Sequence, residues 1–497
     1  MSEKVGLTRA SAPSAALILH SDRPKTGIVH LGLGNFHRAH FAIYTAKAVA
    51  EDGGDWGIYA YSFRSKALAE ALNKQDLLYS VIEFAPKTEA VTIPAIHSAA
   101  VAGPDKVHEV ISEIAKPSTK IISITVTEAG YSISQKTNGL DLDSSDIQSD
   151  LRGNDPKTLI GVIVRGLQAR ISNNAAPITV LSCDNLNSNG DRTKKQVMEF
   201  IQVLPDSESV PLLNFVRNFV TFPNSMVDRI VPATEERHIA LAEGRLGVHD
   251  SSPVPAEPFT MWALGDNFIA GRPAWEKAGA IFTDHVEQFE IMKLRLLNGA
   301  HSLLAYFGAL DNCETIPDAR FTPYIEEALR SVLYKEYLPS LTMPEGLTAD
   351  GYIDQLFSRW SNTVLGDKTN RVGSDGSTKL PQRITEPAIF LHQEGKSAEL
   401  LQLTVAAWLA CIAPLNSFDP GIHARAMKDP AQARLLEFAS TSKSALEMVS
   451  KVFTEGNIFT PQLSQLPGFV DGIAGYLDVI LTSGIKAAVE LALSRSK

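Results

Sequence analysis

Residues 28–37 read Ile28-Val29-His30-Leu31-Gly32-Leu33-Gly34-Asn35-Phe36-His37, an apolar run that leads into two glycines and a helical segment. A strand that enters a glycine turn and then a helix is typical of the first unit of a dinucleotide-binding fold. Gly32 would allow the tight turn, and Gly34 would let a pyrophosphate approach the N-terminus of the helix. Because His37 replaces the third glycine of the GxGxxG pattern, the spacing alone leaves a plain strand-to-helix turn equally open.

The end of the second strand bears on the choice between NAD and NADP. An acidic residue that binds the ribose hydroxyls normally stands there. This chain reads Tyr61-Ser62-Phe63-Arg64-Ser65-Lys66, without a carboxylate. Arg64 and Lys66 could face the 2′-phosphate of NADP instead, although two solvated surface cations are an equal alternative, so NAD and NADP both stay open. The candidate cofactor-binding residues are Gly32, Leu33, Gly34, Asn35, Phe36, Arg64 and Lys66.

The chain changes character along its length. Short β-rich runs alternate with helical runs between residues 27 and 181, which indicates βαβ units and a mainly parallel sheet. From about Asp284 onward, segments with 3.6-residue periodicity dominate. We predict an α/β N-terminal Rossmann-type dinucleotide-binding domain over residues 1–284 and a mostly α-helical C-terminal substrate-binding domain over residues 285–497.

Individual segments can be predicted as well. Two Ser/Gly-rich stretches are expected to be irregular, Ser132–Lys157 as a surface excursion and Gly366–Leu380 as a polar loop able to line a cleft. Strands are expected at Ile28–Leu31, Gly57–Phe63, Lys120–Val126 and Ile178–Ser182. Helical segments are expected at Ala42–Glu51, Val107–Ile114, Val286–Gly308, Pro323–Leu338, Ala398–Cys411, Ala431–Phe453 and Val470–Ser494.

The composition excludes several classes of protein. The 497 residues are 44 % hydrophobic and 21 % charged, as in an ordinary globular chain. A net charge of −10 argues against nucleic acid or anionic lipid as a partner. Three cysteines without a CxxC pair favour a reducing, cytoplasmic compartment. The apolar runs at Ala15–Leu19 and Leu400–Leu415 are too short for a signal peptide and a membrane span respectively, and the second is expected to be a buried helix.

The segment Glu290–Ser302 carries the clearest chemical signal. At about 100° per residue, Lys293 falls within the apolar stripe of a helix. Burial disfavours an ammonium and lowers its pKa, which suits this lysine to general-base chemistry near neutral pH. Asn298 and His301 follow at the border of the same face, where they can bind one substrate together with the lysine. The alternative is a lysine that reaches solvent beside two polar residues at the helix edge.

The sequence resembles the polyol-specific long-chain dehydrogenases, which include mannitol 2-dehydrogenase, arabinitol dehydrogenase and the fructuronate and tagaturonate reductases. The most specific motifs are the Lys-x4-Asn-x2-His pattern of residues 293–301 and the block Val227-Asp228-Arg229-Ile230. The resemblance runs from Gly27 to at least Arg383. The matching blocks cover residues 30–40, 126–131, 182–186 with 189–190, 222–230, 271–276, 293–302 and 379–383.

The resemblance implies a zinc-independent, NAD(P)-dependent oxidoreductase whose substrate lies between a Rossmann-type and a helical domain. Lys293 would take the hydroxyl proton during oxidation, and Asn298 with Asn189 would form an oxyanion hole. His301 would hold a neighbouring hydroxyl. Glu128 would relay the proton to solvent, for which a simply solvated carboxylate is the alternative. Further substrate contacts would come from Arg371, Lys379, Asp228 and Asn185. No His, Cys, Asp or Glu group has the spacing of a catalytic zinc site, so no metal is expected.

The substrate stays open between two classes. A polyol and ketose pair, of the mannitol/fructose or arabinitol/xylulose type, is favoured because the blocks at residues 379–383 and 184–186 are closer to the mannitol branch. A hexuronate reductase of the fructuronate/mannonate type is the alternative, since Arg371 and Lys379 would tolerate either. A non-catalytic nucleotide sensor is a third reading, against which the intact Lys293, Asn298 and His301 argue. Gly265 stands where relatives usually carry an acid, with consequences that the sequence leaves open. The family suggests a monomer or weak dimer.

Overall fold

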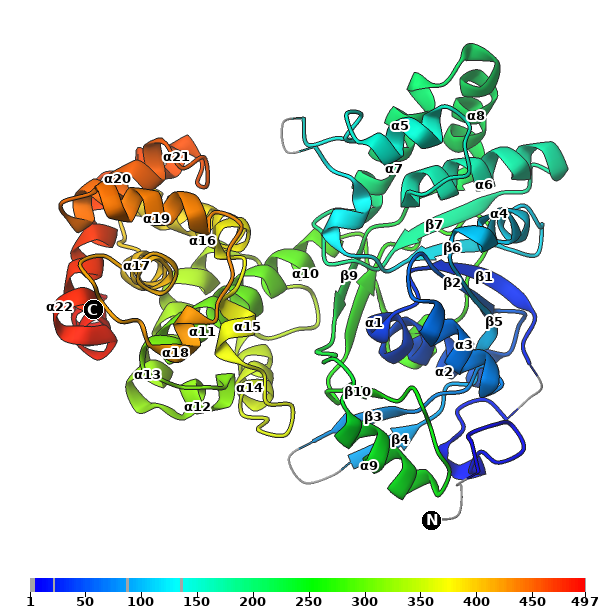
Figure 1. Cartoon of the computed structure of the whole chain (residues 1–497), viewed down its shortest axis with the longest axis horizontal. Coiled ribbons are helices and arrows are strands. Elements are labelled where there is room, and N and C mark those ends of the chain that lie inside the picture. The colour runs from blue at the N-terminus through cyan, green and yellow to red at the C-terminus, as the bar shows by residue number, and fades with distance from the viewer. Residues whose placement is uncertain (1–4, 21–22, 86–88, 135–136, 497) are drawn as a thin grey trace. The chain divides into compact units, whose positions relative to one another are not determined.

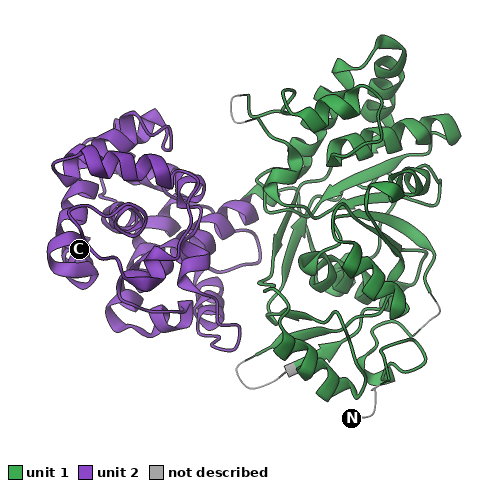
Figure 2. Cartoon of the chain, viewed as in Figure 1, with its two compact units in different colours: residues 1–287 green, residues 288–497 purple. Residues whose placement is uncertain are grey.

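The computed structural model describes residues 5–20, 23–85, 89–134 and 137–496. It divides the chain into two compact units, residues 1–287 and 288–497 (Figure 2). A domain division after residue 284 stays a prediction. The first unit is built on a parallel sheet and the second is helical (Figure 1), so the predicted fold class is confirmed.

The main sheet of the first unit has the strand order β5-β2-β1-β6-β7-β8, and every neighbouring pair is parallel. β1 lies in its interior between β2 and β6, which places the glycine turn at the carboxyl edge of the sheet. All the strands predicted from the sequence are present here. The strands are β1 (Thr26–Leu31), β2 (Gly57–Ser62), β5 (His97–Ala102), β6 (Ile121–Ile124), β7 (Ile178–Ser182) and β8 (Val220–Thr221).

Two hydrophobic cores cover the two faces of this sheet. Ile28 of β1 packs into one core, whereas its neighbours Val29 and Leu31 pack into the other. Successive side chains of a strand point to opposite faces, so a strand buried on both sides reads as a continuous apolar run. The first core includes α2 (Phe41–Asp52) and α3 (Lys66–Lys74). The second includes α4 (Val107–Ile114), α6 (Leu159–Asn173), α7 (Asn189–Val203) and α8 (Asp206–Phe219).

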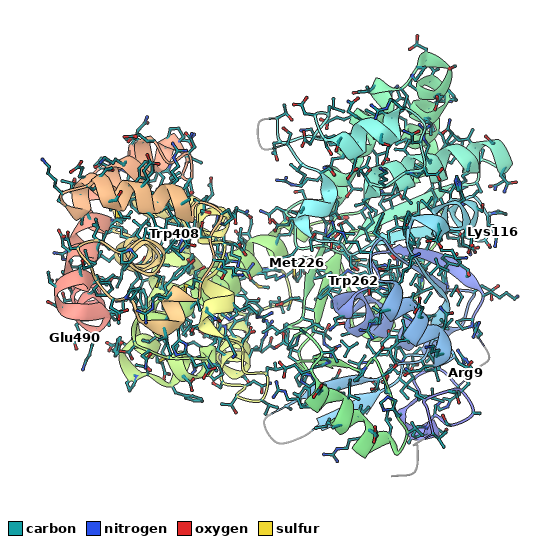
Figure 3. The ribbon with its side chains drawn as sticks, viewed as in Figure 1. Arg9, Lys116, Met226, Trp262, Trp408 and Glu490 are labelled. Carbon is teal, nitrogen blue, oxygen red and sulfur yellow. The ribbon has the colours of Figure 1, made fainter. Side chains whose placement is uncertain are left out.

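Two smaller sheets complete the first unit. The order in one is β10-β3-β4 and in the other β12-β11-β9. Trp262 of β11, labelled in Figure 3, is fully buried. Its ring packs against Phe41 and Trp275, which ties the second small sheet to the α2 side of the main sheet. The bounds are β3 (Val81–Phe84), β4 (Glu89–Thr92), β9 (Ser225–Asp228), β10 (Val254–Ala256), β11 (Met261–Leu264), β12 (Ile281–Phe282) and, for the accompanying helix, α9 (Glu236–Leu246).

The surface excursion expected at Ser132–Lys157 contains a helix that was not predicted. Ser145–Leu151 form a helix, α5, and Asp150 within it is fully buried. The Asp150 carboxylate accepts hydrogen bonds from the backbone amides of Lys157 and Thr158 and from the Thr158 hydroxyl. A buried acidic residue that ties down the following turn is not visible in a Ser/Asp/Gly-rich composition. Residues 135–136 lie outside the described residues.

The second unit is organised around a buried helix. All residues of α17 (Glu399–Ile412) except Glu399 are buried, and α22, α11 and α16 pack around it (Figure 1). This confirms the buried helix expected near Leu400–Leu415. Within the described part of residues 288–497 no β-strand is formed. The other helices are α10 (Val286–Met292), α11 (Ala300–Leu310), α12 (Ile316–Phe321), α13 (Pro323–Ser331), α14 (Ala349–Trp360), α15 (Thr369–Gly373), α16 (Gly376–Gln393), α18 (Gly421–Arg425), α19 (Gln432–Thr441), α20 (Ala445–Thr454), α21 (Pro461–Ser464) and α22 (Phe469–Arg495).

The loop expected at Gly366–Leu380 is largely helical. It contains α15 and the first turn of α16, so a Gly/Ser-rich composition does not make this segment a loop. A Cβ on Gly376 would lie 2.3 Å from Trp408 Nε1, which shows that glycine is needed here for close packing. Asp429 accepts hydrogen bonds from the Ser377 amide and from Trp408, and thereby stabilises the start of α16. These contacts come from distant parts of the chain.

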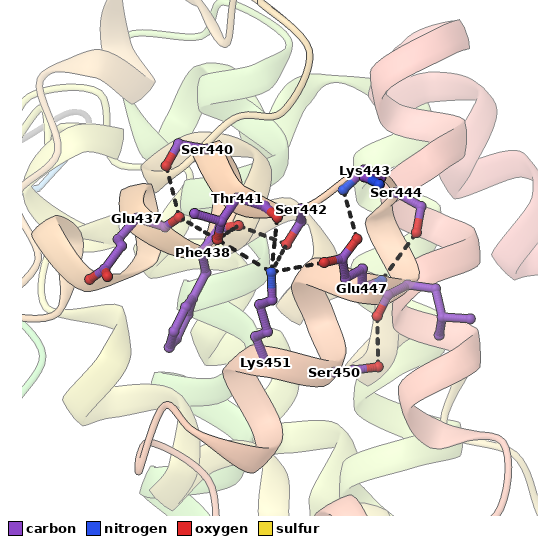
Figure 4. Close-up of polar contacts among 11 residues, drawn as sticks. Glu437, Phe438, Ser440, Thr441, Ser442, Lys443, Ser444, Glu447, Ser450 and Lys451 are labelled. Atoms are coloured by element: carbon purple, nitrogen blue, oxygen red, sulfur yellow. Dashed lines mark hydrogen bonds and ion pairs between the residues drawn. The ribbon is translucent and has the colours of Figure 1, made fainter.

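Two of the long helical segments near the C-terminus are broken or kinked. The expected helix Ala431–Phe453 breaks at residues 442–444 into α19 and α20. Lys451 of α20 donates to the carbonyl of Thr441 at 3.0 Å and pairs with Glu447 at 2.9 Å, so one ammonium stabilises the end of α19 (Figure 4). The expected helix Val470–Ser494 is kinked at Gly484, whose φ is +82°. In the part of the chain that the structure describes, no helix is both long and apolar enough to span a bilayer.

Candidate active site

The two glycines of the turn are required for different reasons. Gly32 has a φ of +115°, and a Cβ on it would lie 1.8 Å from the carbonyl oxygen of Thr125, so no other residue fits beside the end of β6. Gly34 has an ordinary backbone conformation, and the nearest protein atom to a Cβ there, Gly32 O, lies 3.8 Å away. Its missing side chain instead leaves open space at the carboxyl edge of the sheet, which fits the close approach of a dinucleotide.

The turn is held by backbone and side-chain contacts within the first unit. The amides of Gly32 and Leu33 donate to the Tyr61 carbonyl at 2.9 and 3.1 Å. The side-chain amide of Asn35 donates through Nδ2 to Pro232 O and Thr234 Oγ1, both at 3.2 Å. Its Oδ1 accepts from Arg38 at 2.7 Å. Its side chain therefore stabilises the turn, and α1 (Asn35–Ala39) ends after one turn. Phe36 stacks on His40 with ring centroids 5.0 Å apart.

A buried histidine cluster lies beneath the turn and was not predicted. His30 bonds Ser123 Oγ and Thr125 Oγ1, each at 2.8 Å, and its ring stacks on His37 with centroids 3.5 Å apart. His37 in turn contacts His97, with Nε2 atoms 2.9 Å apart. Burial lowers the pKa of His30 and of His97 to about 3, so both are neutral at physiological pH. The cluster thus adds rigidity under the turn without charge.

Glu128 and Asp184 lie on neighbouring loops at the carboxyl edge of the sheet. Glu128 is exposed on the short helical turn that follows β6. Asp184 is buried after β7, where it accepts hydrogen bonds from the Val126 amide at 2.8 Å and the Tyr131 hydroxyl at 2.6 Å. Burial raises the pKa of Asp184 to about 8. Asp184 therefore fixes both ends of the loop that carries Glu128, a role not predicted for it.

Asn189 is engaged within the first unit, and the donor role expected of it stays a prediction. Asn189 is fully buried, and its amide group donates to the carbonyls of Asp184 at 3.0 Å and Ser225 at 2.8 Å. Its Oδ1 accepts from the Ser225 amide at 2.9 Å. Because both amide hydrogens are already used, Asn189 joins the end of β7 to β9 rather than presenting a donor. The neighbouring Asn185 is exposed, and Asp228 is buried at the end of β9.

In the second unit, Lys293 and Asn298 lie on a π-helix, η5 (Lys293–Gly299), inserted between α10 and α11. The 100° spacing assumed for this segment is therefore wrong, since a π-helix has more residues per turn. Lys293 is nevertheless buried, with 9 % of its surface exposed. Arg295, on the same π-helix, donates to the backbone carbonyl of Ser340 and, at 3.0 Å, to its hydroxyl. Short π-helical segments often mark functional positions.

Asn298 and His301 differ from Asn189 in their hydrogen bonding. Both are half-buried, and neither side chain makes a hydrogen bond to any described residue, which leaves their polar atoms available to a ligand. Burial lowers the pKa of His301 to about 4, with Asp367 opposing the shift and Arg383, Arg359 and Arg371 adding to it. Arg383 also donates to Ser302 Oγ at 2.7 Å. His301 is therefore a neutral group that feels the charges of one carboxylate, Asp367, and of three guanidinium groups, of which Arg383 and Arg359 were not predicted.

The two cations expected to contact the substrate both have partners within the unit. Arg371 of α15 pairs with Asp367, and 59 % of its side chain is exposed. Lys379 of α16 donates to the Ser374 carbonyl at 2.7 Å and lies 3.8 Å from Asp375. Lys379 thus stabilises the turn between the two helices, and a substrate role for either residue stays a prediction.

The family is shown by the comparison with known protein families. The model described as the mannitol dehydrogenase Rossmann domain matches residues 26–277, and that of the mannitol dehydrogenase C-terminal domain matches residues 285–481. The chain belongs to the mannitol dehydrogenase family. One family model matches most of each unit of this family member. The resemblance inferred from the sequence motifs is confirmed.

Similar proteins cover nearly the whole chain. D-mannonate oxidoreductase of Escherichia coli K12 is 36 % identical over 472 residues, 94 % of this chain and 96 % of the relative. Polyol:NADP oxidoreductase of Gluconobacter oxydans is 36 % identical over 372 residues, 73 % of this chain and 76 % of the relative. The ternary complex of Pseudomonas fluorescens mannitol 2-dehydrogenase with NAD and D-mannitol has a TM-score of 0.84 at 30 % identity, covering 99 % of this chain and 98 % of that one.

These similarities confirm the enzyme class. This mannitol dehydrogenase family member is an NAD(P)-dependent oxidoreductase of the polyol dehydrogenase type. Among the residues that the structure describes, no group of three or more His, Cys, Asp or Glu side chains is arranged to hold a metal ion.

Proposed function

We propose that this enzyme interconverts a polyol and its ketose, of the mannitol/fructose or arabinitol/xylulose type, with Lys293 as the general base. The observation that carries the proposal is that a buried lysine and an asparagine with an unengaged amide share one π-helical segment. Burial disfavours an ammonium and favours the neutral amine that a base requires. Family membership supports the reaction class.

The chain's own groups would act in a defined order. Lys293 takes the proton of the reacting hydroxyl, and Asn298 donates a hydrogen bond to the oxygen as negative charge develops on it. The neutral His301 holds a neighbouring hydroxyl. Glu128 passes the proton to solvent, a role that its exposure supports. When bound, NAD or NADP accepts the hydride from the alcohol carbon and returns it in the reverse reaction. The open space beside Gly34 fits such a dinucleotide.

The decisive experiment compares chemistry with coenzyme binding. Lys293→Ala should lower kcat for mannitol oxidation by at least about a hundredfold, as expected for loss of a general base, while the Kd for NAD(P)H changes less than about threefold. Lys486→Ala, at an exposed position of α22, is the control for removal of a lysine charge. Normal turnover by the Lys293 variant would show that the base is another group.

A hexuronate is the second candidate substrate, and one observation favours it. Three guanidinium groups, Arg359, Arg371 and Arg383, act electrostatically on His301 against one carboxylate, Asp367, so cations outnumber anions around this residue. Arginine binds carboxylates through paired hydrogen bonds. Comparison of kcat/KM for fructose and for fructuronate separates the two substrates, and Arg383→Gln should weaken only fructuronate reduction if the carboxylate binds there. We also assign Asp228, Asn185, Arg371 and Lys379 to the substrate, and the same comparison of kcat/KM in their variants tests this assignment.

We further propose that the protein acts as a monomer or weak dimer in the cytoplasm. Its cysteines Cys183, Cys313 and Cys411 are all free thiols, which suits a reducing compartment. Light scattering across a concentration series tests the oligomeric state, and cell fractionation tests the compartment.

A further inference from the structure

Two cations, Arg64 and Lys66, follow the end of β2 beside the glycine turn, and only Lys66 pairs with a carboxylate. The Tyr61 carbonyl of β2 accepts from the amides of Gly32 and Leu33, so the turn and the end of β2 are held together. Arg64 follows two residues after the end of the strand and is exposed. Among the described residues it has no acidic partner. Its guanidinium is therefore available to a ligand at the edge where a dinucleotide's adenosine ribose lies in this fold.

Lys66 lies in a different situation. Its ammonium pairs with Asp105, which follows β5, at 2.8 Å. Gly103 makes this possible, because a Cβ there would lie 2.5 Å from Lys66 Cε. The hydrogen bond from Lys66 lowers the pKa of Asp105. The carboxylate that follows the neighbouring strand β5, Asp105, is thus occupied by a lysine, and the pair is neutral as a whole.

Helix α3 adds a third feature. It begins at Lys66, and the side chain of its N-cap, Ser65, makes no capping hydrogen bond. The first amides of a helix lack partners within the helix and attract anions. An arginine, an uncapped helix start and a neutralised carboxylate all favour an anionic group over a ribose diol at this position.

We infer that Arg64 binds the 2′-phosphate of NADP and makes this enzyme prefer NADP over NAD. The inference rests on the proposed function and specifies its coenzyme. A 2′-phosphate carries nearly two negative charges and accepts paired hydrogen bonds from a guanidinium. Lys66 remains bound to Asp105, so its ammonium adds little to the selection.

Binding of nucleotide fragments tests the inference without turnover. Calorimetry on the full chain should show that 2′,5′-ADP binds at least about tenfold more tightly than 5′-ADP, as expected for one charge-assisted pair. Arg64→Gln should reduce this ratio to about threefold or less and leave the Kd of 5′-ADP unchanged. Lys74→Gln, which removes an exposed cation at the far end of α3, should keep the wild-type ratio. Thermal unfolding of each variant verifies that it folds.

Charge reversal sharpens the test. Arg64→Asp supplies the carboxylate that NAD-binding chains carry, and should make NADH bind more tightly than NADPH. Equal affinity of the wild type for 2′,5′-ADP and 5′-ADP, or an unchanged ratio in Arg64→Gln, would overturn the inference. These outcomes differ from failure of the proposed function, which is absence of polyol oxidation with either coenzyme.

Discussion

The ring of Tyr337 packs directly against Gly299, so closely that a Cβ on Gly299 would lie 2.4 Å from Tyr337 Cζ. Gly299 ends the π-helix that carries Lys293, and Tyr337 ends a second π-helix, η6 (Val332–Tyr337). Both residues are buried. The absence of a side chain at residue 299 thus sets the position of the helix that holds the proposed base and donor.

Gly299→Ala should therefore impair both stability and activity. Overpacking of a rigid core costs about 1–3 kcal/mol, and displacement of Lys293 and Asn298 should lower kcat/KM by about tenfold to a hundredfold. Steady-state kinetics and urea unfolding measure the two effects. Tyr337→Leu, combined with Gly299→Ala, should restore part of each, because it removes the ring that the new methyl group meets. Wild-type kinetics in the variant that carries Gly299→Ala alone would contradict this account.

Asn298 and Asn189 should respond differently to replacement by alanine. Asn298→Ala should lower kcat/KM by about a hundredfold or more with little loss of stability, because it removes only a donor to the substrate. Asn189→Ala leaves buried backbone groups of Asp184 and Ser225 without partners, at a cost of about 1–3 kcal/mol for each. Its main effect should be a lower Tm. If Asn189→Ala keeps its Tm and loses kcat, the oxyanion-hole assignment implied by the family resemblance is correct.

The pH dependence of the reaction should be independent of His301. Its pKa is about 4, so this side chain is neutral across the range from pH 5 to pH 9. His301→Asn should raise KM for the polyol while the shape of the kcat/KM profile in this range stays that of the wild type. A limb of the profile that disappears in the variant would show that His301 titrates in the working range.

Glu336 should make stability depend on pH in the second unit. Burial raises the pKa of Glu336 to about 8, although it accepts hydrogen bonds from the Leu400 and Leu401 amides. The folded carboxyl binds its proton more tightly than the unfolded one, so stability falls as pH rises from the unfolded pKa to about 8.

The difference in unfolding free energy between Glu336→Gln and wild type isolates this effect. As pH rises from 6 to 8, this difference in unfolding free energy should change by about 2 kcal/mol in favour of Glu336→Gln. Denaturant unfolding at several pH values measures it, and Glu327→Gln, at an exposed position of α13, is the control. A difference that does not vary with pH would mean that Glu336 is ionised throughout.

The interruption of the helices shows where local patterns stop being informative. The run from residue 286 to residue 308 has apolar residues at helical spacing, and helices do form at both of its ends. The π-helix between them contacts Tyr337 through Gly299 and Ser340 through Arg295, about forty residues away, and no local pattern announces these contacts. In the same way Gly376 is typical of a loop by composition, whereas Trp408 and Asp429 make it the start of a helix.

The sequence by itself determined the parallel sheet, the glycine turn and the helical second half. Each of these follows from short-range periodicity and from residue types that restrict the backbone, which act within a few positions of the chain. Only the tertiary structure decided which polar groups are available. Asn189 and Asn298 are the same residue type, and Arg64 and Lys66 carry the same charge. One member of each pair is occupied by a partner distant in the sequence, Ser225 for Asn189 and Asp105 for Lys66.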